Sequence, residues 1–284
     1  MKETGKNEKR PRKIESLLLG IAGGIFLVSG VWLWRMWSGY EAGKREYARL
    51  EAMAVRERQT GEDAEVGDEG GSAAGETAGS GRTEIPDDSL VPLGAYRLKE
   101  IDFESLQAEN EDICGWLEVP GLEISYPVVQ GEDNDYYLKR TFRKESNGAG
   151  SIFMDMRNDR DLTDRNTIIY GHNMKNGSMF GKLKQYRDEE VLKGNPVFYY
   201  YTPEQTYQCQ IISCRTVNAK ESEYPVGFQD ADSYRNYLER IAEKSWHRSP
   251  FHAKEGDRLM MLSTCTGSKT ERFVVQAKII ELSE

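Results

Sequence analysis

The sequence predicts a mainly β domain over residues 91–284, preceded by an apolar helix and a polar linker. From residue 91 onward, short runs rich in β-branched and aromatic residues alternate with Gly, Pro, Asn and Asp. Near the N-terminus lies an uncharged apolar run of 18 residues, and an acidic segment rich in Gly and Ser separates the two regions. This pattern of strands is typical of a closed barrel or a sandwich.

The apolar run, LLLGIAGGIFLVSGVWLW (17–34), predicts a helix that crosses a membrane. At about 1.5 Å per residue it would be roughly 27 Å long, close to the thickness of a bilayer's hydrocarbon core. An aromatic belt of the kind found at membrane interfaces follows at its far end, formed by Trp32, Trp34 and Trp37. We therefore expect a transmembrane anchor over residues 16–37.

The residues on either side of this run predict its orientation and its fate. Residues 1–15 carry many Lys and Arg, and such a tail stays in the cytoplasm. The alternative is a cleaved signal peptide, but bulky WLWRMW follows the run where a cleavage site needs small residues. We expect a single-pass protein of the cell membrane, with an N-terminal cytoplasmic tail and an extracellular main domain.

Residues 38–90 are expected to connect the anchor to this domain. Residues 40–58 are charged and helix-prone, which predicts a short stalk. Residues 61–90 hold nine acidic residues against one basic residue, with few large apolar residues, which is typical of a flexible linker. The net charge of the chain, −9, argues against nucleic acid as a partner.

Eight strands and two helices are expected within the β domain. The strands are 114–120, 124–130, 150–155, 166–171, 197–202, 206–217, 257–265 and 272–282. One short helix, over 102–110, opens the domain with Asp102 as its cap. A longer helix over 232–246 has apolar residues at helical spacing and Asp232 or Ser233 at its cap.

The chain has four cysteines, at 114, 209, 214 and 265. Cys209 and Cys214 lie in one predicted strand at an odd separation, so we expect them on opposite faces and not bridged. Cys114 and these two are expected to be buried packing residues. No CxxC motif and no histidine spacing typical of a metal site is found, and we expect neither a metal nor a cofactor.

His172, Cys265 and Arg272 are the candidate catalytic residues. Cys265 ends one strand and Arg272 begins the next, so a hairpin would place them side by side at one rim of the domain. His172 follows another strand. A thiol, an imidazole and a permanent cation are the groups needed for acyl transfer through a thioester. Taken singly, each is more often a packing residue or a surface charge.

The motifs NTIIYGHNM (166–174) and LSTC (262–265), with a following Arg before a valine-rich strand, resemble the sortase family of membrane-anchored cysteine transpeptidases. WLEVPGLEISYPVVQGEDNDYYL, GSIFMDMRND and YGHNMKNGSMFGKLKQY are similar to class B members in particular. The resemblance covers roughly residues 95–284. It implies an eight-stranded sortase-type barrel with an N-terminal helix and one long helix in the loop before the Cys265 strand.

The resemblance also implies roles for individual residues. Cys265 would be the nucleophile, His172 the acid/base, and Arg272 the cation that holds substrate and oxyanion. Residues that would line the substrate groove are Asn134, Leu138, Tyr170, Ser263 and Tyr224. Two features depart from the class B pattern, Thr266 after the cysteine and a short turn before Arg272, and both bear on the substrate motif.

The implied substrates are secreted proteins with a C-terminal sorting signal, and the implied acceptor is an amine of a peptidoglycan precursor or of a pilin. A pilin-polymerising sortase and a non-catalytic membrane-tethered β domain are the alternatives. A papain-like hydrolase places Cys before His in the chain, whereas His172 precedes Cys265 here. An L,D-transpeptidase would cluster the two residues in one motif, which this chain lacks.

Overall fold

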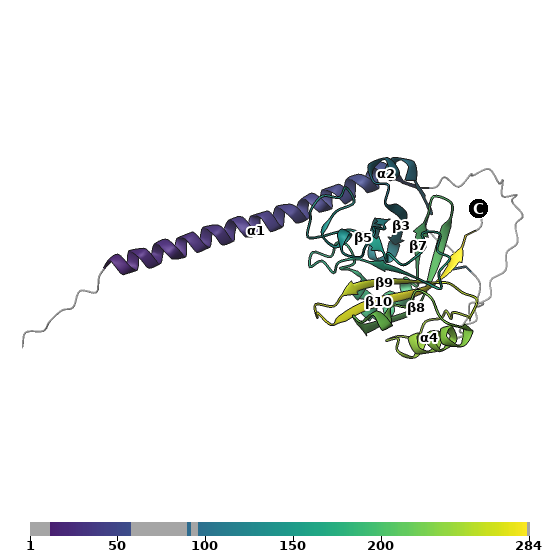
Figure 1. Cartoon of the computed structure of the whole chain (residues 1–284). Helices are drawn as coiled ribbons and strands as arrows, with labels where there is room; N and C mark the ends of the chain where they lie inside the picture. The colour runs from purple at the N-terminus through teal and green to yellow at the C-terminus, as the bar shows by residue number, and fades with distance from the viewer. Residues whose placement is uncertain (1–11, 58–89, 92–95, 283–284) are drawn as a thin grey trace, which may run out of the picture.

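The structure is a computed structural model that describes residues 12–57, 90–91 and 96–282 (Figure 1). Residues 1–11 of the expected basic tail and 58–89 of the expected acidic linker lie outside this described part. Eight strands form a closed barrel, which decides between the barrel and the sandwich. They are β3 (Ile113–Val119), β4 (Ile124–Val129), β5 (Ile152–Met154), β6 (Asn166–Tyr170), β7 (Val197–Tyr201), β8 (Thr206–Asn218), β9 (Leu259–Cys265) and β10 (Glu271–Glu281). All eight expected strands are confirmed to within a few residues at each end.

The order of the strands around the barrel is β10-β8-β7-β3-β4-β5-β6-β9. Two of the neighbouring pairs, β4 with β5 and β6 with β9, are parallel, and the others are antiparallel. Because β6 and β9 run in the same direction, both end at one rim, and β10 starts there. This topology brings two distant parts of the sequence, the end of β6 and the β9–β10 turn, to one edge.

The barrel interior is filled with large apolar side chains. Every residue of β3 is buried, because this strand is covered on both faces, and Trp116 has no exposed surface. Phe198 and Tyr200 from the next strand, β7, and Phe273 from β10 are likewise almost fully buried. Burying a side chain of this size stabilises the fold by about 2–3 kcal/mol, so the interior holds the rim in place.

The expected long helix is α4 (Ala231–Glu243), which packs Tyr234, Tyr237 and Ile241 against the outside of the barrel. It begins earlier than the sequence indicated, because Asp230 is the cap: its carboxylate accepts a hydrogen bond from the Ser233 backbone N–H. The prediction of Asp232 or Ser233 as the cap is wrong. Ser233 instead closes a capping box back onto Asp230.

The prediction that Cys209 and Cys214 face opposite sides of their strand is also wrong. A β-bulge shifts the register between β8 and β10, where Ser213 pairs with Gln276 and Ile211 with Ala277. The extra residue, Ile212, turns outward, so both cysteines point into the same core. They are nevertheless unbridged, as expected.

The long helix α1 (Arg12–Ala54) extends away from the barrel at one end and packs on it at the other (Figure 1). Tyr47, Leu50 and Ala54 are buried in the same cluster as the barrel interior. The packed core therefore begins well before residue 91, where we expected the domain to start. The chain then forms β1 (Val55–Glu57), which pairs antiparallel with β2 (Lys99–Ile101).

Several short helices complete the described part. Asp102 caps α2 as expected, accepting from the Ser105 backbone N–H. The short helices are α2 (Phe103–Glu109), η1 (Pro120–Leu122), η2 (Tyr136–Lys139), η3 (Leu183–Arg187), α3 (Glu189–Gly194) and η4 (Glu221–Glu223).

Among the described residues, no helix presents a stretch with both the length and the hydropathy needed to cross a bilayer. The expected anchor, 16–37, includes side chains that lie outside the described set, at 16–17, 19, 32–33 and 35–37.

Candidate active site

Cys265 and Arg272 are direct neighbours across the β9–β10 ladder. Arg272 pairs with Cys265 in the register of the two strands, so their side chains lie on the same face of the sheet. The predicted proximity of these residues is confirmed. Both side chains are partly exposed. A thiol and a guanidinium therefore share a solvent-accessible rim.

His172 lies at the same rim, directly after β6. Tyr170 pairs with Ser263 in the parallel β6–β9 ladder, and the Gly171 N–H donates to the Ser263 carbonyl at 3.1 Å. Two residues further along each strand come His172 and Cys265. The Asn173 amide donates to the Cys265 carbonyl at 2.7 Å, which ties the histidine loop to the cysteine backbone.

The His172 ring makes a hydrogen bond that requires a proton on one particular nitrogen. Its Nε2 atom lies 2.7 Å from the Leu138 carbonyl oxygen. Because a carbonyl oxygen can only accept, Nε2 carries the proton. In the neutral ring this leaves Nδ1 unprotonated, and Nδ1 is then the nitrogen that is free to exchange a proton.

The Arg272 guanidinium is held by the turn that precedes its own strand. Its Nη1 atom donates to the Glu271 carbonyl at 2.9 Å and to the Lys269 carbonyl at 3.3 Å. These two contacts occupy one of its nitrogens. A planar guanidinium has five N–H donors, so others remain for a carboxylate or an oxyanion.

Cys265 differs from the other three cysteines in its burial. Cys114, Cys209 and Cys214 are buried, whereas Cys265 is partly exposed. Burial raises the pKa of the Cys114 and Cys214 thiols to about 12, and the pKa of Cys209 is raised as well. These three are therefore protonated packing groups, as the sequence predicted. Cys265 is the accessible thiol among the four.

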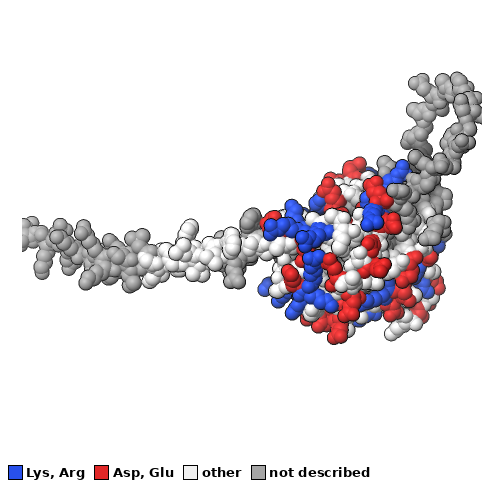
Figure 2. All heavy atoms as spheres, turned by 90° about the horizontal axis from the view of Figure 1, so that it is seen from above, with Lys and Arg blue, Asp and Glu red and all other residues white. Residues whose placement is uncertain are grey.

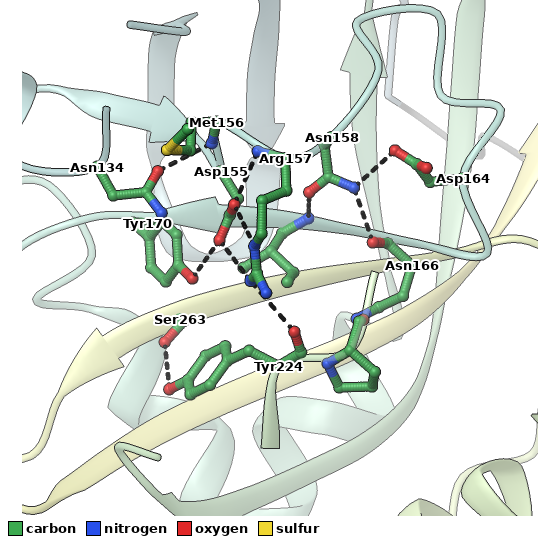
Figure 3. Close-up of polar contacts among 12 residues, drawn as sticks. Asn134, Asp155, Met156, Arg157, Asn158, Asp164, Asn166, Tyr170, Tyr224 and Ser263 are labelled. Carbon is green, nitrogen blue, oxygen red and sulfur yellow. Dashed lines mark hydrogen bonds and ion pairs between the residues drawn. The ribbon is translucent and has the colours of Figure 1, made fainter. Parts of the chain in front are cut away.

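Three of the predicted groove residues meet beside this rim (Figure 3). The Tyr224 hydroxyl and Ser263 Oγ lie 3.1 Å apart. The Tyr170 and Tyr224 rings face each other with centroids 6.0 Å apart. Tyr170 is partly exposed here, whereas the Tyr224 ring and Ser263 are buried beneath it.

The other two predicted groove residues lie near this surface but act through different groups. Leu138 contacts His172 through its carbonyl, and its side chain packs against the core. The Asn134 side-chain oxygen accepts from the Met156 backbone N–H at 2.9 Å (Figure 3). Asn134 thus fixes the loop that follows β5, and this loop approaches Tyr170.

A polar cluster behind Tyr170 was not predicted. The Asp155 carboxylate accepts two hydrogen bonds from the Arg157 guanidinium, each 2.9 Å long, and one of 2.8 Å from the Tyr170 hydroxyl (Figure 3). Arg157 also donates to the Tyr224 carbonyl at 3.2 Å. The cluster therefore connects the two tyrosines. The only trace of it in the sequence is an Asp-x-Arg pair after a strand.

Burial alone would raise the pKa of Asp155, but the hydrogen bonds from Arg157 and Tyr170 outweigh it, and the pKa lies below its ordinary value. Burial and the nearby Asp155 charge raise the pKa of Tyr170. The cluster is therefore a carboxylate, a guanidinium and a neutral phenol at neutral pH. Among the described residues, no three His, Cys, Asp or Glu side chains gather as a metal site would need.

Two curated relatives are 35% and 37% identical to this chain over the regions that align. The sortase B of Listeria monocytogenes is 37% identical over 182 residues, which cover 63% of this chain and 74% of the relative. The sortase B of Staphylococcus aureus is 35% identical over 184 residues, covering 64% of this chain and 75% of the relative.

Solved structures agree with these relatives. A Staphylococcus aureus sortase B–substrate complex superposes with a TM-score of 0.61 at 36% identity, covering 64% of this chain and 85% of that one. A Bacillus anthracis sortase B superposes with a TM-score of 0.67 at 30% identity, covering 87% and 100%. The sortase domain family model matches residues 117–280. The chain thus belongs to the sortase family, as a class B sortase, and it is a cysteine transpeptidase.

Proposed function

We propose that Cys265 is the nucleophile of this sortase, with His172 as the acid/base and Arg272 as the oxyanion-stabilising cation. The observation that carries this assignment is the register of three strands. Arg272 pairs with Cys265 across β9 and β10, and the His172 loop is bound to the Cys265 carbonyl through Asn173. The accessible thiol of the described chain lies between the other two groups.

The first half-reaction breaks a peptide bond in a C-terminal sorting motif of a secreted protein. The Cys265 thiolate attacks the carbonyl carbon of a threonine, forming a C–S bond. Arg272 and backbone N–H groups stabilise the negative oxygen of the tetrahedral intermediate. The intermediate collapses with loss of the C–N bond, and His172, whose Nδ1 has taken the proton of the Cys265 thiol, gives this proton to the departing amine. The Nε2–H group keeps its hydrogen bond to the Leu138 carbonyl throughout.

In the second half-reaction, an amine of a peptidoglycan precursor attacks the thioester. Its proton passes to His172, the C–S bond breaks, and a new peptide bond joins the secreted protein to the wall. Cys265 leaves this intermediate as the thiolate, which regenerates the starting enzyme. A pilin lysine is the alternative acceptor, and the same chemistry would then polymerise pilins.

We propose that the sorting motif binds over the partly exposed Tyr170, with the buried Ser263 and Tyr224 supporting this surface from below and Asn134 and Leu138 at its edge. The position of this surface supports the proposal, because Tyr170 and Ser263 each lie two residues before a proposed catalytic residue on adjacent strands. A side chain two residues along a strand lies on the same face, about 7 Å away. That spacing suits alternate residues of an extended peptide, whose side chains point to the same side.

We further propose that α1 anchors the enzyme in the cell membrane, with the barrel on the extracellular side. Outside the barrel, α1 exposes large apolar side chains, including Ile25 at 62%, Phe26 at 78% and Val28 at 71%. Figure 2 shows the described stretch of this helix that extends away from the barrel as uncharged surface, in contrast to the mixed charges of the barrel. An exposed apolar surface of this extent needs an apolar environment.

The experiment for the catalytic assignment uses the full chain in detergent micelles with a library of sorting-motif peptides. Mass spectrometry of the intact protein detects an acyl group on Cys265. Without an amine, the thioester should hydrolyse slowly. With a peptidoglycan stem peptide it should give a ligated product. Preferential ligation to a pilin lysine peptide would assign the enzyme to pilus assembly.

Cys265→Ala should abolish both the adduct and turnover while circular dichroism remains that of the wild type. His172→Gln should also lose turnover but keep a reactive thiol. Retained cleavage by Cys265→Ala would refute the nucleophile assignment. The anchoring proposal is tested separately, by fractionating cells and treating intact protoplasts with protease. Recovery of the full chain in the soluble fraction would overturn it.

A further inference from the structure

The end of α1 that packs on the barrel holds one specific segment, residues 136–151. The Tyr47 hydroxyl donates to the Gly150 carbonyl at 2.7 Å and lies 3.2 Å from Ser151 Oγ. Tyr47 is 6% exposed, so these contacts are shielded from water. About two turns earlier on the helix, the Asn147 amide donates to the Gly39 carbonyl at 2.8 Å. The helix therefore contacts this segment through hydrogen bonds as well as apolar packing.

Within the segment, Gly150 lies directly against the carbonyl of Leu138. Gly150 has a φ of +59°, and a Cβ atom placed on it would lie 2.7 Å from the Leu138 oxygen. The next residue, Ser151, is hydrogen-bonded to the backbone on both sides of Leu138. The Ser151 N–H donates to the Tyr137 carbonyl at 3.0 Å, and Ser151 Oγ donates to the Arg140 carbonyl at 2.8 Å. Any shift of Gly150 therefore shifts the Leu138 carbonyl.

The Leu138 carbonyl is the group that accepts from His172 Nε2. Three consecutive contacts thus run from the helix to the imidazole: Tyr47 to Gly150, Gly150 to Leu138, and Leu138 to His172. The last of these defines which ring nitrogen carries the proton. A misplaced carbonyl would let the ring rotate or adopt the other tautomer, with the proton on Nδ1 and none on Nε2.

We propose that Tyr47 is a positioning residue for His172, so that docking of the α1 helix on the barrel sets the tautomer of the catalytic imidazole. The proposal rests on the proposed acid/base role of His172 for its effect on turnover, but not for its effect on the tautomer. The end of the anchor helix is in this way a part of the catalytic apparatus. Tyr47 itself touches neither substrate nor thiol.

The test is Tyr47→Phe in the full chain, which removes one oxygen atom and leaves the ring in place. The kcat for transpeptidation should fall about five- to tenfold, because proton transfer by a positioned base contributes far more than that in total. The KM for the sorting peptide should stay unchanged, because Tyr47 does not line the groove. A melting scan checks that the variant is folded.

The ¹⁵N spectrum of the imidazoles distinguishes positioning of His172 from a merely structural role, because a structural role would leave the spectrum unchanged. The chain has three histidines, and His172→Gln identifies the signals of His172. In the wild type they should report Nε2–H, and in Tyr47→Phe a mixture of tautomers. His247 serves as an internal reference, because its Nε2 lies 2.8 Å from the Arg187 carbonyl, away from α1.

Tyr234→Phe is the matched control. Its hydroxyl also donates to a backbone carbonyl at 2.7 Å, that of Asp257, but it lies on α4. It should change neither kcat nor the His172 signals. An unchanged His172 spectrum in Tyr47→Phe would overturn the proposal, and so would an equal loss of kcat in both variants. A changed spectrum with full turnover would support the positioning but refute the catalytic role of His172.

Discussion

Arg272 stands directly across the ladder from Cys265, at the point where β9 ends and β10 begins. The cation and the thiol are therefore fixed by backbone hydrogen bonds on both sides, and not by a flexible loop. Such an arrangement holds a positive charge next to a reacting centre before the substrate arrives. Electrostatic stabilisation of a transition state depends on this kind of preorganisation.

Arg272→Lys should therefore lower kcat/KM by about 100-fold, because a point charge cannot reproduce the planar fork of donors. Transpeptidation of a sorting-motif peptide measures this. Arg235→Lys, at an exposed ion pair on α4, is the control and should behave like the wild type. Wild-type rates in Arg272→Lys would reduce Arg272 to a structural role.

The native protein should react with iodoacetamide at a single thiol. Cys265 is accessible, whereas burial raises the pKa of Cys114 and Cys214 to about 12 and shields them from the reagent. Peptide mapping by mass spectrometry locates the adduct. All four cysteines should react after denaturation in guanidinium. Equal labelling of two or more thiols in the folded protein would contradict the assigned burial.

Asp155→Asn should destabilise the fold by about 2 kcal/mol at pH 7, because it weakens charged hydrogen bonds at a buried site. The Asp155 side chain is 0% exposed and binds Arg157. Its loss should also raise KM several-fold, since Tyr170 loses a hydrogen-bond partner. Urea unfolding and peptide kinetics measure the two effects.

The pH dependence of this difference has a definite sign. The folded pKa of Asp155 lies below the ordinary value of an aspartate. Its contribution to stability is therefore present above pH ~4 and disappears as the pH falls through the folded pKa. The wild type and Asp155→Asn should differ in unfolding free energy at pH 7 and converge only as the pH falls below the folded pKa of Asp155. A constant difference over this range would mean that the carboxylate charge contributes nothing.

Gly171→Ala should destabilise the barrel by about 1–3 kcal/mol and lower kcat, because its new methyl group overpacks the site beside His172. A Cβ there would lie 2.5 Å from Ile152 Cδ1 and 2.7 Å from the Phe180 ring. Gly194→Ala, in α3, meets nothing within 4 Å and is the control. Thermal unfolding and steady-state kinetics compare the two. Equal melting temperatures would show that the neighbours of Gly171 yield easily.

The sequence predicted the barrel strands well because their limits are set locally. Gly, Pro, Asn and Asp break the apolar runs, and a short polar turn makes a hairpin of the last two strands, so Cys265 and Arg272 had to meet. The side of the barrel on which His172 ends was not determined locally. It depends on the parallel pairing of β6 with β9, which joins strands that are distant in sequence.

Other features could not be predicted because they depend on tertiary contacts. The bulge at Ile212, which turns Cys209 and Cys214 to the same side, leaves no mark in the residue pattern. The Asp155 cluster joins two loops and a strand. The His172 contact is made to the backbone carbonyl of Leu138, and every residue type has a carbonyl.

The continuity of α1 from Arg12 to Ala54 has a geometric consequence for an anchored enzyme. If α1 enters the bilayer at one end, its packing on the barrel at the other end would fix the orientation of the Cys265 rim relative to the membrane. Inserting one residue between Trp34 and Gly39 would rotate the barrel by about 100° around the helix axis. Inserting seven residues would nearly restore its orientation and move it about 10 Å along the axis. Lengthening the acidic stretch between β1 and β2 would do neither, because this stretch comes after the part of α1 that packs on the barrel.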